Sequence, residues 1–267
     1  MSEPSSVGRA EFERWLAAEL GVARFRDYCP NGLQVAGTER IQHIVTGVTA
    51  SLALLEQAVA RGADAVLVHH GWFWKNDDPR IVGMLRKRLQ LVLQHNLNLF
   101  AYHLPLDAHP RWGNNAQLAR VLGLEPDMAP GKGGNEPSAP LTLDADGLIW
   151  SGTAPGLATV GEFIHRVEQR LGRAPLWVGE ADAPLGKVVW CTGGAQGYMH
   201  QAIDAGASLY LTGEASEYNT HLARETGVAF VAAGHHATER YGVQAVGRAV
   251  AERFGVAVEF VEIDNPV

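Results

Sequence analysis

Two adjacent histidines follow a short apolar segment of the chain. Residues 65–68 are all apolar and run directly into His69 and His70. A short, valine-rich segment is typical of a strand that is buried on both faces of a parallel sheet. In open α/β sheets, ligands bind beyond the carboxyl ends of such strands, where imidazoles can bind a metal or a substrate. For this pair alone, the alternative is that two polar residues close a strand.

Two further histidines also follow apolar segments, and each stands four residues before a carboxylate. These pairs are His103 with Asp107 and His235 with Glu239. Chance or helix capping explains most single pairs of this kind. Two such pairs, together with the adjacent histidines, predict a metal site. The candidate ligands are His69, His70, His103, Asp107, His235, His236 and Glu239, with Glu214 nearby.

The chemistry of this set favours divalent metal ions. Imidazole and carboxylate ligands without thiolates suit Zn, Mn, Fe or Ni better than they suit a structural zinc site. Five or more ligands suggest two ions, which together can clamp and deprotonate a water at neutral pH. We expect surface or satisfied core positions for five other histidines: His43, His95, His165, His200 and His221.

Hydrophobic periodicity predicts the strands and helices that must position these residues. In the first half we expect strands at 41–48, 64–68 and 97–102, with helices at 9–20, 51–60, 79–93 and 115–122. In the second half we expect strands at 188–191, 208–211 and 228–232, with helices at 197–204, 217–225 and 238–254, and a last strand at 256–263.

The two halves resemble each other. Gln57-Ala58 and Gly62-Ala63 recur 144 positions later as Gln201-Ala202 and Gly206-Ala207, and the two histidine–carboxylate pairs stand 132 positions apart. We therefore predict an α/β fold of two similar βαβ-based halves from an internal duplication, with the metal site at the strand C-terminal ends between them. The halves are 1–124 and 187–267. Residues 125–186 are expected to be a linker and a small α/β insert, in which Thr159 and Glu162 have capping-box spacing.

Composition excludes several classes of protein. Of 267 residues, 46% are hydrophobic, which is enough for a sizeable core. A net charge of −7 without a long basic run argues against sequence-independent nucleic-acid binding. No run of 18 uncharged apolar residues and no basic leader is present, so we expect no membrane association and a cytoplasmic location. Cys29 and Cys191 are expected to be buried small hydrophobes rather than a disulfide or zinc ligands.

Two segments near the candidate site allow alternative interpretations. Trp72, Phe73 and Trp74 follow the adjacent histidines and could stack on a substrate, but a core or interface role is as consistent with their types. The segment 193–197 is rich in glycine and follows a strand, as phosphate-binding turns do. Because it lacks the spacing of a Rossmann or P-loop motif, we expect a tight strand–helix turn there.

The sequence resembles the Nif-three-like dinuclear-metal family, whose bacterial members are catalogued as type 2 GTP cyclohydrolase I homologues. The likeness spans most of the chain, although residues 125–187 carry no matching motif. The matching segments are Asn31-Gly32-Leu33-Gln34-Val35, His69-His70-Gly71-Trp72-Phe73-Trp74, Ala101-Tyr102-His103-Leu104-Pro105-Leu106-Asp107 with Gly113-Asn114-Asn115, Gly234-His235 with Thr238-Glu239, and the terminal Asp264-Asn265-Pro266-Val267.

The resemblance implies an α/β subunit of two similar halves and a ring-shaped homohexamer. It implies a site for two divalent ions per subunit and places His103 beside them. The implied ligands are His69, His70, Asp107, His235 and Glu239. The reaction catalogued for the family is hydrolytic opening of the guanine ring of GTP.

We therefore expect a dinuclear-metal-dependent hydrolase that acts on a small nucleotide-like substrate. In this hypothesis Asp107 or Glu239 bridges the ions, and His103 is the catalytic proton carrier. The first alternative is a non-catalytic protein that stores, delivers or senses metal ions, or that binds a partner. The second is a phosphoesterase, because the same two-metal clamp supports that reaction.

Overall fold

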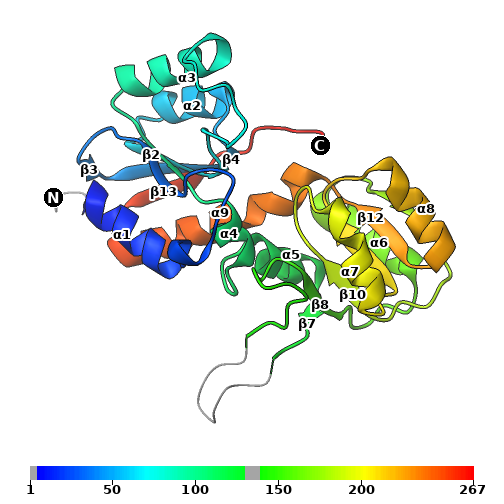
Figure 1. The fold of residues 1–267 in the computed structure, drawn as a ribbon. Helices are drawn as coiled ribbons and strands as arrows, with labels where there is room; N and C mark the ends of the chain where they lie inside the picture. The colour runs from blue at the N-terminus through cyan, green and yellow to red at the C-terminus, as the bar shows by residue number, and fades with distance from the viewer. Residues whose placement is uncertain (1–4, 130–138) are drawn as a thin grey trace. The chain divides into compact units, whose positions relative to one another are not determined.

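The computed structural model describes residues 5–129 and 139–267, and its chain forms two compact units (Figure 1). Unit 1 contains the chain up to Leu106 together with Gly242–Asp264. Unit 2 contains Asp107–Tyr241 and Asn265–Val267. The chain passes from one unit to the other within α4 (Leu104–Ala108) and again within α9 (His235–Phe254).

Unit 1 is built on a five-stranded sheet. Its strand order is β13 (Ala257–Phe260), β4 (His43–Thr49), β5 (Ala65–His70), β6 (Asn98–Ala101) and β2 (Gly32–Val35). The first four strands are parallel, whereas β2 runs antiparallel to β6 at the edge. A separate two-stranded sheet pairs β1 (Val7–Gly8) with β3 (Arg40–Ile41). The central strand β5 is buried because helices cover both faces of the sheet.

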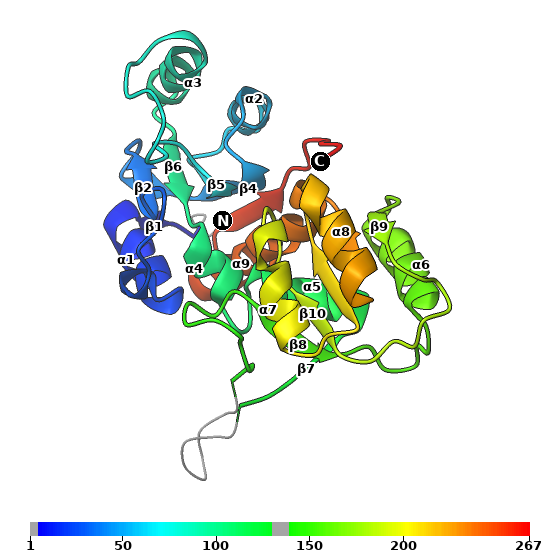
Figure 2. The same ribbon diagram turned by 45° about the vertical axis from the view of Figure 1, so that its right-hand side comes forward.

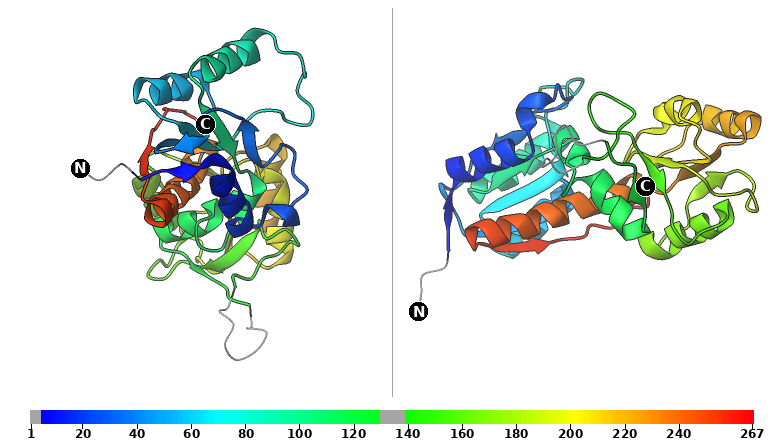
Figure 3. Two further views of the ribbon diagram at one scale, coloured as in Figure 1. Left: turned by 90° about the vertical axis from the view of Figure 1, so that its left-hand side faces the viewer. Right: turned by 90° about the horizontal axis from the view of Figure 1, so that it is seen from below.

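Helices α2 (Leu52–Ala60) and α3 (Gly83–Gln94) lie side by side on one face of this sheet (Figure 3). The side chains of Val66 and Val68 point into the apolar cluster beneath them. On the other face lies α1 (Arg9–Glu19), which is followed by the 3-10 turn Val22–Arg24. Phe12 of α1 packs edge-on against Phe100 of β6, with a distance of 4.9 Å between the ring centroids. The alternation of side chains along each strand therefore supplies both layers of the core.

Unit 2 is built on a six-stranded sheet. Its strand order is β7 (Glu125–Pro126), β8 (Trp150–Thr153), β10 (Val188–Trp190), β11 (Leu209–Thr212), β12 (Ala229–Ala232) and β9 (Leu176–Val178). Strands β10, β11 and β12 are parallel, and β8 and β9 flank them in the antiparallel direction. Helices α5 (Asn114–Leu122) and α6 (Val160–Leu171) pack on one apolar face, and α7 (Met199–Asp204) and α8 (Glu217–Thr226) on the other (Figure 2).

The mixed α/β class predicted from the sequence is confirmed. Both sheets contain three parallel strands in the same spatial order, β4-β5-β6 and β10-β11-β12, followed by an antiparallel edge strand. The register also repeats: Ile44 pairs with Ala65 and Val188 with Leu209, so the residues in each strand stand 144 positions apart. This common order agrees with the predicted repeat. Its origin in an internal duplication stays a prediction.

The position of the chain end corrects the expectation that the second half is continuous in sequence. The last strand was expected to complete that half, but β13 pairs in parallel with β4 in the sheet of unit 1. The reason is that α9 begins in unit 2 and ends in unit 1, where Phe254 contacts Phe12. The residues of each compact unit therefore share a sheet. The predicted boundaries at 124 and 187 instead divided the chain into consecutive segments.

The expected insert is also part of a larger sheet. Strands β8 and β9 pair with β10 and β12, so the segment between 139 and 186 extends the sheet of unit 2 rather than forming a separate α/β piece. The capping box is present at the start of α6: Thr159 accepts a hydrogen bond from the Glu162 amide, and the Glu162 side chain accepts one from the Thr159 amide. At the start of the predicted linker, residues 125–126 form β7, and residues 130–138 lie outside the described residues.

Two further sequence-based expectations can be compared with the fold. Within the described residues, no helix combines the length and the apolar character needed to cross a membrane. Cys29 and Cys191 are both buried as free cysteines, as expected from their number and spacing. Burial raises the pKa of Cys191 well above its ordinary value, so that thiol stays protonated at neutral pH.

Candidate metal sites

In unit 1, the adjacent histidines are the last two residues of β5, at the carboxyl end predicted from the sequence. The His69 ring is fully buried, and its Nδ1 lies 3.0 Å from the Tyr102 carbonyl oxygen. A carbonyl only accepts, so Nδ1 carries the hydrogen and Nε2 carries the lone pair. The His70 Nδ1 lies 3.2 Å from the Thr49 hydroxyl. Both rings are therefore held through Nδ1.

His103 follows β6 and is held by a carboxylate from a distant loop. Its Nδ1 donates to Asp27 Oδ1 at 2.7 Å, and its backbone amide donates to Asn31 Oδ1 at 2.7 Å. The Asp27 carboxylate also accepts from the Asn31 side chain and from the amides of Tyr28 and Leu104. Burial would raise the pKa of Asp27, but the hydrogen bonds and the charge of His103 outweigh it and lower this pKa to about 2.

The three histidines of unit 1 converge. His69, His70 and His103 each offer a ring nitrogen, and these nitrogens lie within 4.8 Å of one another. The ring centroids of His69 and His70 are 4.4 Å apart, and those of His69 and His103 are 5.1 Å apart. The convergence follows from the sheet: β5 and β6 are parallel neighbours, so the residues after their carboxyl ends meet at one edge.

A second group in unit 1 has metal-ligand residue types but unsuitable chemistry. Asp27, Cys29 and His103 also offer atoms within 4.8 Å of one another. Burial, and then the charge of Asp27, raises the pKa of the Cys29 thiol to about 12. A metal binds the thiolate rather than the thiol. The expectation that cysteine takes no part in the site therefore agrees with the environment of Cys29.

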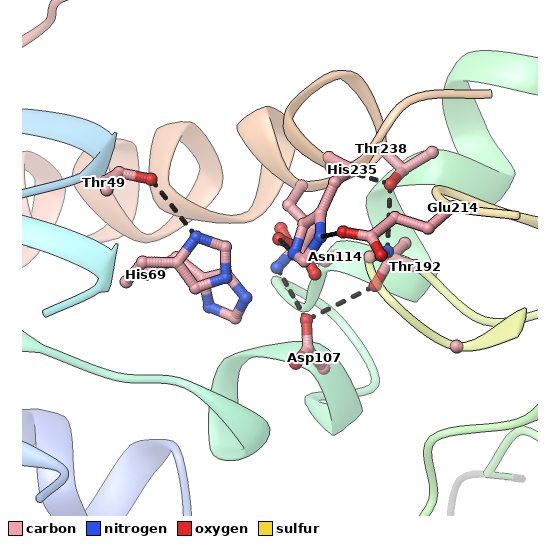
Figure 4. Close-up of polar contacts among 12 residues, drawn as sticks. Thr49, His69, Asp107, Asn114, Thr192, Glu214, His235 and Thr238 are labelled. Carbon is pink, nitrogen blue, oxygen red and sulfur yellow. Dashed lines mark hydrogen bonds and ion pairs between the residues drawn. The ribbon is translucent and has the colours of Figure 1, made fainter. Parts of the chain in front are cut away.

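In unit 2, His235 lies between two carboxylates at the start of α9. Its Nδ1 is 2.7 Å from Glu214 Oε1, and its Nε2 is 3.0 Å from Glu239 Oε2 (Figure 4). His235 and Glu239 are one helical turn apart, so both side chains project from the same face of α9. Burial would lower the pKa of His235, but the two carboxylates outweigh it and raise this pKa to about 9.

Asp107, also in unit 2, is buried and held by neutral donors. Its Oδ1 accepts from the Asn114 side chain at 2.8 Å and from the Thr192 hydroxyl at 3.3 Å (Figure 4). Asn115 donates to the Asp107 carbonyl and to the Leu148 carbonyl, and its own side-chain oxygen accepts from the Thr192 amide. These bonds fix the carboxylate on the short helix α4 without a cationic partner among these donors.

The glycine-rich segment after β10 lies against the unit 2 carboxylates. A Cβ at Gly193 would overlap Glu239 Oε1, and Gly193 has the positive φ of 69° that favours glycine. The Gly193 amide donates to the Thr238 hydroxyl at 3.0 Å. At Gly194, a Cβ would lie 3.6 Å from Glu214 and from His235. The segment is a tight strand–helix turn, as expected, and it forms the surface against which Glu239 and His235 pack.

All four histidines share one feature: an oxygen atom holds Nδ1. These oxygens belong to the Tyr102 carbonyl, the Thr49 hydroxyl, Asp27 and Glu214. Histidines that ligate metals through Nε2 are typically oriented in this way, because the Nδ1 hydrogen bond fixes the tautomer and the ring direction. The donor set therefore fits divalent metal ions. Sequence reasoning missed Asp27, Thr49 and Thr192 as supporting residues, although Asn31 near Asp27 belonged to a recognised motif.

The aromatic segment after β5 divides into three environments. Trp72 is buried, and its indole N–H donates to the Ala50 carbonyl at 2.9 Å, so it belongs to the core. Trp74 is half-buried and meets the His103 ring edge-on at a centroid distance of 4.9 Å. Phe73 is 41% exposed. The sequence alternatives of core and stacking surface thus apply to different members of the segment.

The other candidate residues lie in varied environments. His236 is 8% exposed, and its backbone amide donates to the Val267 carbonyl. Among the histidines expected outside the site, three contact nearby side chains. His43 meets Glu259, His165 meets Gln169 and His221 meets Glu217.

Comparison with known proteins defines the class to which this fold and donor set belong. The family model described as Duf34/NIF3 (NGG1p interacting factor 3) matches residues 8–266. The chain belongs to this family, and the resemblance identified from the sequence motifs is confirmed. The GTP cyclohydrolase 1 type 2 homolog of Allochromatium vinosum is 52% identical over 247 residues, covering 92% of each chain. That of Pseudomonas aeruginosa is 51% identical, covering 92% of this chain and 94% of its own.

Solved structures share the whole fold. One, described as protein ybgI of unknown function, is 44% identical, has a TM-score of 0.89, and aligns over 98% of this chain and 100% of its own. TTHA1606 from Thermus thermophilus is 32% identical with a TM-score of 0.81, and aligns over the same shares of the two chains. The two-unit α/β architecture is therefore that of the family.

Proposed function

We propose that this protein is a divalent-metal-dependent hydrolase that acts on a small nucleotide-like molecule. In this proposal the metal ligands are His69 and His70 of unit 1, and Asp107, His235 and Glu239 of unit 2. About two ions bind per chain, drawn from Zn, Mn, Fe and Ni. The name GTP cyclohydrolase 1 type 2 homolog, carried by relatives about half identical to this chain, supports a nucleotide substrate.

The observation that carries the proposal is the common orientation of the four imidazoles through Nδ1. For His69 and His103 the partner is an acceptor only, so these rings keep the tautomer that presents Nε2 as a ligand or a base. A stable fold alone does not require this arrangement at every histidine. Divalent ions bound by such a set would polarise a substrate and activate water at neutral pH.

The residues of this chain have separable roles in the proposal. Asp27 Oδ1 accepts a hydrogen bond from His103 Nδ1 at 2.7 Å and so keeps His103 Nε2 available to take up a proton from the reacting water. Asn114 and Thr192 position Asp107 through its Oδ1. Glu214 positions His235 through Nδ1. Each supporting residue thus acts on one proposed ligand or base. The effect of substituting one of them should therefore be distinguishable from the effects of substituting the others.

Metal analysis tests the ligand set first. Protein purified without added metal, then loaded separately with each of the four ions, is analysed by mass spectrometry of its elements. We expect about two ions per chain, and loss of at least one in His69→Ala, His235→Ala and Glu239→Ala. His221→Ala is the matched control, because His221 and Glu217 form an exposed i,i+4 pair that resembles His235–Glu239 in spacing. Unchanged metal content in all three ligand variants would refute the site.

Turnover separates the hydrolase from its alternatives. Metal-loaded protein is incubated with GTP, other nucleotides and phosphoesters, and loss of substrate is followed by chromatography. We expect metal-dependent turnover, and a rate reduced by about 10²-fold or more in His103→Ala while the ions are retained. Transfer of ions to an apo-acceptor protein without turnover of any compound would favour metal handling, and turnover of phosphoesters alone would favour a phosphoesterase.

The assembly and location follow the same proposal. We propose that the chain forms a homohexameric ring in the cytoplasm, as the family resemblance implies. Sedimentation at micromolar concentration should give the mass of six chains of 28.8 kDa. A monomer at that concentration would contradict the ring.

A further inference from the structure

A cavity of about 920 Å³ opens beside His70 in unit 1. It is lined by Thr49 and His70, by residues of the segment 71–82, and by Met84, Leu85 and Arg88 of α3. Its size lies within the range of roughly 300–1,000 Å³ that small-molecule pockets occupy. All of its lining residues come from unit 1. The cavity therefore has the size and the position of a ligand pocket that reaches one of the proposed metal ligands.

Arg88, in the wall of this cavity, has a buried side-chain nitrogen without a partner in the described structure. Its Nε is buried and has no hydrogen-bond partner among the described residues. Burial lowers the pKa of Arg88, and no nearby carboxylate in the described parts of the chain acts in the opposite direction. A buried N–H group without an acceptor costs free energy, so the unpartnered Nε of Arg88 calls for a reason.

Arg80, which also lines the cavity, has hydrogen-bond partners for its guanidinium. Arg80 Nε donates to Asp78 Oδ1 at 3.0 Å and to Oδ2 at 2.9 Å, and Arg80 Nη2 donates to Oδ2 at 2.6 Å. Lys75 and Asp77 also line the cavity. Arg88 differs from Arg80 in that its Nε has no hydrogen-bond partner among the described residues. Its planar fork suits the two oxygens of a carboxylate or a phosphate.

Aromatic side chains line the same cavity as Arg88 and His70. Trp74 lines the cavity, and its ring centroid is 6.0 Å from that of His70. The preceding residue, Phe73, has a φ of 65°, which a bulky side chain rarely adopts. Backbone strain of this kind is concentrated at ligand-binding segments, because the surrounding structure must hold it in place. The strained segment presents Trp74 on the cavity wall, where a planar ligand group can contact the indole.

We infer that this cavity binds a small planar oxyanion: Arg88 takes the phosphate or carboxylate group, and Trp74 contacts the planar part. The ligand then extends toward His70. The inference rests on the proposed function because it assigns the ligand chemistry of the same site. It adds a binding residue, Arg88, that lies on α3 and outside every motif of the family resemblance.

Calorimetric titration of metal-free protein tests the inference separately from metal binding and turnover. The probes are GMP, which carries a phosphate, orotate, which is a planar carboxylate, and guanosine, which has no charge. We expect GMP or orotate to bind, and the dissociation constant to rise tenfold or more in Arg88→Gln. Arg88→Lys keeps the charge without the planar fork and should give an intermediate value. Guanosine should bind more weakly than GMP and should not respond to either substitution.

Arg86→Gln is the matched control. Arg86 is exposed on the same helix, two residues away, and its contact is with Gln90 one turn further on. The Arg86→Gln variant should bind the anions as the parent protein does. The circular dichroism spectra of all variants should superimpose on that of the parent. The inference is overturned if neither GMP nor orotate binds the parent, or if Arg88→Gln and Arg88→Lys both bind them unchanged. If His235→Ala loses metal but still binds the anion, the anion pocket has been tested separately from the metal site. Failure of the metal site alone would therefore not overturn anion binding at Arg88.

Discussion

His103 and His235 follow the third parallel strand of their respective units, and a carboxylate holds each through Nδ1 at 2.7 Å. The two carboxylates differ in exposure. The Asp27 side chain is 3% exposed, whereas the Glu214 side chain is 38% exposed. Asp27 also accepts three further hydrogen bonds from Asn31, Tyr28 and Leu104.

This difference in exposure means that the carboxylate–histidine hydrogen bond contributes differently to the stability of the two units. Asp27 joins the loop before β2 to the end of β6, so its loss affects the fold of unit 1. Glu214 faces solvent on one side, so screening reduces what its contact contributes to stability. Its main effect is on the orientation of His235. We therefore expect substitution of Asp27 to affect mainly stability, and substitution of Glu214 to affect mainly metal binding.

The largest effect should come from Asp27→Ala. The change leaves four donors without their buried acceptor, and we expect a loss of about 3–5 kcal/mol in the free energy of unfolding. Urea denaturation followed by circular dichroism measures it. Glu214→Ala is the comparison in unit 2 and should lose less than about 1 kcal/mol. Equal losses in the two variants would contradict the assigned difference.

The contribution of Asp27 should also depend on pH in a defined direction. Its pKa is lowered in the folded protein from 3.8 to about 2. A lowered pKa stabilises the fold above the unfolded value, and this stabilisation is lost as the pH falls from about 4 toward 2. The stability gap between the parent and Asp27→Ala should therefore narrow in that interval. A gap that stays constant between about pH 5 and pH 2 would show that the carboxylate charge does not contribute.

Gly193→Ala should have the next largest effect, and it should reduce metal binding rather than disrupt the sheet of unit 2. The new Cβ would overlap Glu239 Oε1, and the φ of 69° disfavours any residue with a side chain. We expect metal affinity to fall by about 100-fold or more, measured by competition with a fluorescent chelator, because Glu239 must move. Gly206→Ala is the control: it also has a positive φ, of 71°, but its Cβ would meet no atom within 4 Å.

Glu214→Gln should have a smaller effect on the same measurement. Glutamine keeps an oxygen that can accept from His235 Nδ1, but it removes the charge that strengthens the bond. Partners of metal-bound histidines typically contribute about 10- to 100-fold to affinity. We expect a loss near the lower end of that range. No loss of affinity would remove Glu214 from the positioning residues of unit 2.

The smallest effect should be seen at the two cysteines. Each unit contains one, and burial raises the pKa of both Cys29 and Cys191. A thiol reagent should therefore modify neither in the native protein at about pH 8, and both in denaturant. Cys29→Ser and Cys191→Ser should retain the full metal content. Loss of an ion in either variant would mean that a thiolate belongs to a site.

Sequence alone determined the local parts of this protein. Apolar segments predicted the parallel strands, and the position of histidines after them predicted where His69, His70, His103 and His235 lie. These inferences succeed because a strand and the residues that follow it are set by a few neighbouring side chains. The repeat offset of 144 was also visible, and it recurs in the register of β4 with β5 and of β10 with β11.

Only the tertiary structure decided which distant residues support the histidines. Asp27 and His103 are 76 positions apart, and no periodicity links them. Likewise β13 pairs with β4 although it ends the chain, and Thr192 reaches Asp107 across 85 positions. Contacts of this kind depend on how packed elements bring side chains together, and local propensity does not encode them. The unpartnered Nε of Arg88 has the same origin, because its burial without an acceptor among the described residues is a property of the folded surroundings.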